Sequence, residues 1–322
     1  MLKEEKKWYD GFIDMLYQKF PKKQSLVQEL IDLLVIEREA VYRRLRREVM
    51  FSAHEIAIIA NAWDISLDNV MNINSNTIAF HLRKMNYINP TEEEVIFLNK
   101  VIQGIQYAKN FPTTEFMDVC NKLPRQLVAS FEHLNQFYLF KWLFQYSKEK
   151  DILPFSKVVI SEEKAKVTQE YNQAIRTVPN SSFIFDRLLF DNLVSDIQYF
   201  YSIRMLSDEE KELIKRDLIA LLNYLQEIAN VGCYPDTQNK VNLYVSHLYV
   251  DTNYNYVYTP EVNICFVHVF EKFELFTYHS EMAANFRSWM QIKKRSSMLI
   301  SEVDERSRIE FFSKQRRLID SL

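Results

Sequence analysis

Between Leu26 and Asp68, apolar residues recur at helical intervals in three successive segments. The first segment repeats them three or four positions apart and closes at Ile36, and the polar triplet 37–39 follows. A second helix is predicted over 38–48, and a third begins near Phe51. Because the breaks are short, the pattern indicates helices that meet at corners, in the order of a helix-turn-helix.

The helix predicted over 38–48 separates apolar from charged positions. At 100° per residue, Val41 and Leu45 fall on one side, and the opposite side carries Glu39, Arg43, Arg46 and Arg47. Five arginines lie between positions 38 and 47. A guanidinium group can pair with a phosphate or with the O6/N7 edge of guanine, and a helix fits the major groove of DNA. The pattern therefore favours a DNA-reading helix.

This segment resembles the λ-repressor-like helix-turn-helix family, particularly the BetR-type regulators, over about residues 8–73. The spacing of a supporting first helix is carried by Trp8, Phe12, Met15, Leu16 and Phe20. Residues 51–68 look like the family's fourth helix and the entry to a fifth. Two features depart from the family: Val35 stands in the turn where glycine is common, and the apolar pair of the third helix is spaced by four residues.

The resemblance implies that the third helix, here 38–48, enters the groove and that the start of the second helix touches phosphate. The residues expected to contact DNA are Arg38, Glu39, Tyr42, Arg43, Arg46 and Arg47 on the third helix, and Gln24, Ser25 and Gln28 on the second. Arg43 and Arg47 are expected one turn apart on the outer face of the third helix.

An alternative interpretation is a solvated surface held by salt bridges. Residues 1–72 contain eleven Lys and Arg against twelve Asp and Glu, so the segment is not basic as a whole. Under this alternative the protein is a helical interaction scaffold whose N-terminal domain does not bind DNA.

Length and composition limit the folds that the remainder of the chain can adopt. The 322 residues suffice for two domains, and only three glycines occur, at 11, 104 and 232. Glycine-rich phosphate loops and glycine-dependent sheet turns are therefore not expected, and a mainly α fold is predicted. We expect a helix-turn-helix domain over 1–73, a connecting region over 74–90, and a larger helical regulatory or oligomerisation domain over 91–322.

Helical patterns are predicted over about 91–109, 113–121, 124–147, 161–176, 181–205, 207–230, 281–296 and 307–318. Ser207 and Glu210 form a capping-box pattern, as do Thr91 and Glu94. Residues 241–258 are rich in β-branched and aromatic side chains around the turn signal 251–253, which predicts a small β-hairpin. The segment 259–280 is left open between a third strand and a buried helix, with helix favoured after about Glu271.

Catalytic and metal-binding patterns are sparse. Cys265 and His268 form the only close Cys/His pair, and a core histidine is the simpler interpretation. Hydrolase-elbow, zinc-protease and phosphate-loop motifs are absent from the sequence, and runs of acidic residues fall in first helical turns, where the helix dipole favours negative charge. No catalytic residue, metal or cofactor is expected, and the chain is not predicted to be an enzyme.

Three widely spaced cysteines, the lack of an apolar leader and the lack of a long apolar run favour a cytoplasmic protein without a membrane span. We expect a transcription regulator that binds double-stranded DNA as a homodimer. Candidate dimer contacts are the hairpin and the C-terminal helix with Ile309, Phe311, Phe312, Leu318 and Ile319. Whether aromatic clusters line a pocket for a peptide or small-molecule effector or simply fill the core is open.

Overall fold

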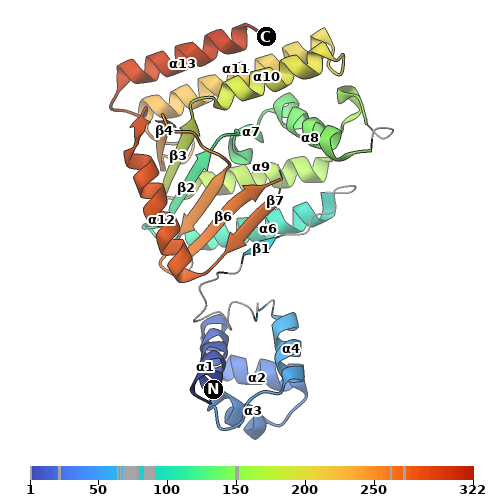
Figure 1. The fold of residues 1–322 in the computed structure, drawn as a ribbon, viewed down its shortest axis with the longest axis vertical. Helices are drawn as coiled ribbons and strands as arrows, with labels where there is room; N and C mark the ends of the chain where they lie inside the picture. Colours follow the sequence, from blue (N-terminus) through green and yellow to red (C-terminus); the bar gives the residue numbers. More distant parts are fainter. Residues whose placement is uncertain are drawn as a thin grey trace. The chain divides into compact units, whose positions relative to one another are not determined.

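A computed structural model describes residues 2–20, 23–63, 65, 67, 78, 80–82, 91–148, 152–261, 263–270 and 273–322. The chain divides into two compact units, Met1–Ala79 and Phe80–Leu322 (Figure 1). The segment 74–90, expected to be a connection, lies mostly outside the described residues, although His81 and Leu82 form a strand of the second unit.

The first unit contains four described helices, α1 (Leu2–Lys19), α2 (Lys23–Leu34), α3 (Arg38–Leu45) and α4 (Ala53–Ala62). Their apolar faces meet in one core, in which α3 buries the predicted pair Val41 and Leu45. Helix α4 begins with a capping box, because the Ser52 hydroxyl accepts from the Glu55 amide while the Glu55 carboxylate accepts from the Ser52 amide. Apart from Leu67, the expected fifth helix lies outside the described residues.

The turn between α2 and α3 spans only residues 35–37. Val35 has φ of 52°, a left-handed conformation that favours glycine, and its side chain is 89% exposed. A β-branched residue there is strained, so the turn has a conformational cost of about 1–2 kcal/mol. Val35 therefore takes a backbone conformation that glycine adopts more readily.

Helix α3 is shorter than predicted. It ends at Leu45, Arg46 is its C-cap, and Arg47 takes φ of 63°. The predicted continuation to Glu48 is therefore wrong, because the left-handed residue turns the chain away from the helix axis and sends it toward α4.

The hydroxyl of Tyr9 holds this loop in place. Tyr9 is buried on α1, where its hydroxyl accepts a hydrogen bond from the Phe51 amide at 3.0 Å and lies 3.2 Å from the Arg44 carbonyl oxygen, to which it donates. One side chain thus ties α1 to both ends of the α3–α4 connection.

The second unit interleaves helices with an eight-stranded sheet. Its described helices are α6 (Thr91–Ala108), α7 (Arg125–Val128), α8 (Glu132–Tyr146), the 3-10 turn η2 (Phe155–Lys157), α9 (Glu162–Arg176), α10 (Leu189–Ser202), α11 (Asp208–Val231), α12 (Ser280–Arg295) and α13 (Glu305–Asp320). The predicted capping box of Ser207 and Glu210 at the start of α11 is confirmed, and Gly232 ends this helix with φ of 70°.

The strands are β1 (His81–Leu82), β2 (Glu115–Cys120), β3 (Asn180–Asp186), β4 (Lys240–Ser246), β5 (Tyr254–Tyr258), β6 (Asn263–Val269), β7 (Phe273–Thr277) and β8 (Ser297–Leu299). They lie in the order β1-β7-β6-β5-β2-β3-β4-β8. Strands β2, β3 and β4 are parallel, and every other neighbouring pair is antiparallel.

The two faces of this sheet are covered unequally. One face packs against α6 to α11 and α13 in the main hydrophobic core, and Figure 1 shows α10, α11 and α13 side by side. On the opposite face, side chains such as Met117, Ile184 and Tyr244 meet Phe286 and Met290 of α12 in a smaller core. One helix covers this second face within the described part of the chain.

The mainly α prediction is wrong, because two segments predicted to be helical contain central strands. Residues 115–120 form β2 and residues 180–186 form β3, while α10 starts only at Leu189. These strands are buried on both faces, so their apolar runs lack the alternation that marks a half-buried strand. The predicted helix over 124–147 is divided into α7 and α8.

The predicted hairpin over 241–258 is also wrong. Strand β4 pairs with β3 and β8, whereas β5 pairs with β2 and β6. The segment after Glu271, for which helix was favoured, contains β7. Scarce glycine does not prevent the sheet, because two parallel connections run through helices and because Phe270, with φ of 48°, occupies a left-handed position between β6 and β7.

The residues expected to form a dimer contact are used within the monomer. Phe311, Phe312 and Ile319 of α13 belong to the main core, as do Val241, Leu243 and Val245 of β4. Ile309 is exposed. The aromatic run in α8 is likewise core, since Phe137, Phe140 and Trp142 are buried.

The three cysteines are free thiols in different surroundings. Cys120 and Cys265 are buried, whereas Cys233 is partly exposed. Burial raises the pKa of Cys120 and raises that of Cys265 to about 12, so both remain protonated. Across the described residues, we find no helix with the length and apolarity needed to span a membrane.

The Tyr9 contact gives a stability prediction. Tyr9→Phe removes the acceptor of the buried Phe51 amide and should lower the free energy of unfolding of the first unit by about 1–2 kcal/mol. Urea denaturation together with hydrogen exchange of the Phe51 amide measures this. Tyr17→Phe is the matched control on α1, because the Tyr17 hydroxyl has no hydrogen bond to a described residue. Equal losses in the two variants would contradict the role given to the Tyr9 hydroxyl.

Candidate nucleic-acid interface and a buried polar network

Helix α3 presents a polar face opposite its buried pair. Arg38, Glu39 and Arg43 are exposed and Tyr42 is half-buried. The Arg43 side chain is 55% exposed, and Glu48, at 3.7 Å, is its one ion-pair partner among the described residues. Such an exposed pair is weak, so Arg43 can exchange its carboxylate partner for another anion at little cost.

Arg38 connects the two helices of the motif. Its Nη2 donates to Oε1 of Gln28 on α2 at 3.1 Å, and Nε2 of Gln28 donates to Asp32 at 3.0 Å. Gln24, Ser25 and Gln28 are all exposed on α2. The structure therefore brings Gln28 to Arg38 and leaves Gln24 and Ser25 at the surface near the start of α2.

Arg44, which the sequence did not assign to the DNA-binding set, is a structural residue. Its guanidinium donates to both carboxylate oxygens of Glu55 on α4, at 2.8 and 3.3 Å, and its side chain is only 19% exposed. The bidentate pair joins α3 to α4. Burial by itself would raise the pKa of Glu55, but hydrogen bonds from Ser52 and Arg44 outweigh it and hold this pKa below its usual value.

Arg47 does not lie where the sequence predicted it, whereas Arg46 stays beside Glu39, with which it was expected to share the polar side of the helix. Arg46 contacts Glu39 and Glu48, at 2.7 and 2.9 Å. Arg47 leaves the helix and pairs with Asp10 and Asp14 on α1, at 2.7 and 2.6 Å. The expectation that Arg43 and Arg47 share an outer face one turn apart is therefore wrong, because Arg47 faces α1.

A second group of polar side chains lies in the sheet of the second unit, and sequence reasoning missed it. Asp118 of β2 is fully buried and accepts a hydrogen bond from Nε2 of Gln126 on α7 at 2.8 Å. Across the β2–β5 pair, Asp118 faces Asn255, whose Oδ1 contacts Nε2 of His268 on β6. His268 in turn lies 3.7 Å from Glu274 on β7. The network thus crosses four strands on one face of the sheet.

Asp118 has an unusual protonation equilibrium. Burial raises the pKa of its carboxyl to about 7, and the amides of Gln126 and Asn255 only partly oppose this. Within the part of the chain that the structure describes, its Oδ1 has no hydrogen-bond partner. The network can therefore take up and release a proton near neutral pH. A sequence signal was present in the lone aspartate of an apolar run, but its burial depends on pairing with distant strands.

Cys265 and His268, the close pair in the sequence, lie on opposite faces of β6. Cys265 belongs to the core under α12, whereas His268 belongs to the polar network. A spacing of three in a strand separates side chains in this way. The described residues contain no group of three His, Cys, Asp or Glu side chains placed to hold a metal ion.

No family model, no curated protein and no solved structure matches the chain. The resemblance of residues 8–73 to λ-repressor-like regulators therefore depends on the sequence pattern alone.

The polar network gives a pH prediction. The raised pKa means that the folded state binds a proton more tightly than the unfolded state, so ionisation of Asp118 removes stability as pH rises from about 4 to about 7. Asp118→Asn cannot ionise. The variant should therefore gain stability relative to the parent as pH rises, by on the order of 1–4 kcal/mol at about pH 8. Denaturant unfolding at several pH values measures the difference, and a difference that does not change with pH would contradict it.

Proposed function

We propose that the chain is a sequence-specific DNA-binding transcription regulator in which α3 enters the major groove. The observation that carries the proposal is the corner between α2 and α3, which buries Val41 and Leu45 and leaves Arg38 and Arg43 on the outer face. A guanidinium group on such a face can donate two hydrogen bonds to guanine or pair with phosphate.

The contact set is narrower than the one expected from sequence. Arg38, Glu39, Tyr42 and Arg43 are the proposed base-reading candidates, and Gln24, Ser25 and Gln28 are proposed to contact phosphate at the start of α2. Arg46 lies at the end of α3, where it can contact phosphate once it leaves Glu39 and Glu48. Arg47 is assigned to the contact with α1.

Residues 293–295 are three consecutive cationic residues near the end of α12, and their contacts leave them little part in DNA binding. Lys294 turns to the sheet and donates to Ser182, and Lys293 lies over the ring of Trp289. Arg295 is exposed. We therefore assign DNA contact to the first unit alone.

The alternative is a protein-interaction scaffold, and the ion pairs favour it. Arg43, Arg44, Arg46 and Arg47 each meet a carboxylate of the first unit. Arginines that are already paired with carboxylates do not require the phosphate groups of DNA to neutralise their charge. Binding to duplex DNA at several salt concentrations separates the two functions, because phosphate contacts release counterions and a scaffold shows no steep salt dependence.

Arg43→Ala tests the reading helix. The variant should weaken binding to a selected operator by about 1–3 kcal/mol and leave the unfolding transition unchanged, because Arg43 is exposed and its pair with Glu48 is long. Arg216→Ala on α11 is the control for loss of one exposed positive charge. If both variants bind the operator as tightly as the parent, α3 is not the reader.

We also propose that the protein acts in the cytoplasm as a homodimer, since one short helix covers few base pairs and paired heads about 34 Å apart read two half-sites. Light scattering at micromolar concentration should give twice the mass of 38.6 kDa. A monomer both alone and on operator DNA would contradict the dimer without bearing on Arg43. The proposed role of the second unit is dimerisation or effector sensing.

A further inference from the structure

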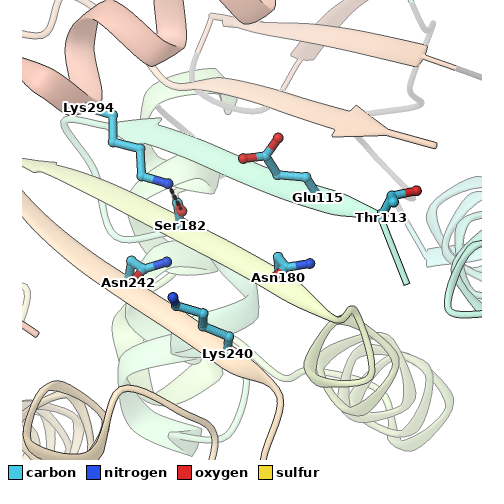
Figure 2. Close-up of a pocket in the computed structure, with 7 residues that line it drawn as sticks. All are labelled: Thr113, Glu115, Asn180, Ser182, Lys240, Asn242 and Lys294. Carbon is cyan, nitrogen blue, oxygen red and sulfur yellow. Dashed lines mark hydrogen bonds between the residues drawn. The ribbon is translucent and has the colours of Figure 1, made fainter. Parts of the chain in front are cut away.

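A cavity of about 250 Å³ lies on the α12 face of the sheet, beside the amino ends of the parallel strands (Figure 2). Strands β2, β3 and β4 supply most of its lining, and α12 supplies one side chain. The lining is almost entirely polar and consists of Thr113, Glu115, Asn180, Ser182, Lys240, Asn242 and Lys294. A lining of this kind favours a hydrophilic ligand over an aromatic or lipid one.

Two ammonium groups approach the same part of the sheet. Figure 2 shows Lys294 reaching in from α12 and Lys240 from the start of β4, toward Ser182 and Asn242. Nζ of Lys294 donates to Oγ of Ser182 at 3.1 Å and lies 5.4 Å from the centre of the Tyr244 ring. Among the described residues, neither lysine forms an ion pair with a carboxylate.

The one acid in the lining is already engaged. Glu115 accepts from Nη2 of Arg287 at 3.1 Å and from Nε2 of Gln291 at 3.4 Å, both on α12. The negative charge of Glu115 is therefore neutralised mainly by Arg287. The two lysines keep an excess of positive charge.

This excess is unfavourable in the isolated protein. Lys294 is half-buried, and burial, assisted by the nearby charge of Lys240 and opposed by Glu115, lowers the pKa of its ammonium group. A negative ligand group between the lysines would attract both ammonium groups, which otherwise repel each other. It would also compensate for the hydration that the Lys294 ammonium loses on burial. The Asn242 amide is available to the same group, because its side chain has no hydrogen bond to a described residue.

We propose that this cavity binds a small hydroxyl-bearing phosphate ester, with its phosphate between Lys240 and Lys294 and its hydroxyl groups toward Glu115 and Thr113. Two lysines match the double charge of a phosphate monoester at neutral pH. The cavity is larger than a phosphate ion requires, and its acceptor groups suit the hydroxyl groups of the ester. This site is independent of DNA binding by the first unit.

Calorimetric titration of the full chain with glucose 6-phosphate as the probe tests the site, with glucose, gluconate and inorganic phosphate as comparison ligands. We expect saturable binding of glucose 6-phosphate, weaker binding of inorganic phosphate, and no binding of glucose. Lys240→Gln should weaken the binding at least about tenfold, since it removes a charge-assisted hydrogen bond. Lys166→Gln, an exposed lysine on α9, should bind like the parent.

Lys240 is exposed, so its variant keeps the fold, which circular dichroism verifies; Lys294→Gln is the second variant and should show the same loss. The proposal is overturned if the folded parent binds neither phosphate probe up to about 10 mM. It is also overturned if Lys240→Gln and Lys294→Gln both retain parental affinity. Gluconate binding as tightly as glucose 6-phosphate would overturn the preference for phosphate.

Discussion

The parallel pairing of β2, β3 and β4 is the constraint on which the second unit depends. Parallel neighbours cannot be joined by tight turns, so each of the two connections must cross the sheet through helices. Both connections step in the same direction along the sheet, and crossovers of one hand then lie on one face. This explains why α7 to α11, which belong to the two connections, lie on a single face, where α6 and α13 join them in the main core, while α12 covers the other face.

That asymmetry positions both polar regions of the unit. On the thickly covered face, Asp118 is held away from water by α7 and its neighbours, and its proton equilibrium follows from this burial. On the thinly covered face, α12 ends near the amino ends of the parallel strands and leaves the polar cavity uncovered. The three parallel strands thus carry a desolvated carboxyl group on one face, and on the other face two ammonium groups, that of Lys240 from β4 and that of Lys294 from α12.

The first unit was the more predictable from sequence, because its elements depend on local patterns. The spacing of Val41 and Leu45 placed the buried side of α3 correctly. The end of α3 was missed, because Arg46 and Arg47 are good helix formers whose positions are set by acids distant in sequence, such as Asp10 and Asp14. Local propensity does not report a partner on another helix.

The second unit was mostly misread, for a related reason. A strand such as β3, with only the apolar run 183–185 between polar residues, shows no alternation and is identified by its neighbours on both sides, which lie about 60 residues away in sequence. The long helix α11 was predicted well because Ser207, Glu210 and Gly232 mark its ends locally. The cavity could not be predicted, since Lys240 and Lys294 meet only when α12 has packed across the sheet.

The unequal exposure of the three thiols gives the protein a natural attachment point. A maleimide or iodoacetamide reagent requires an accessible thiolate, which burial denies to Cys120 and Cys265. Cys233 is the thiol left to react, and it forms an isolated β-bridge with Lys240 at the rim of the cavity. An environment-sensitive fluorophore can therefore be coupled beside the cavity in the unaltered sequence, without engineered cysteines.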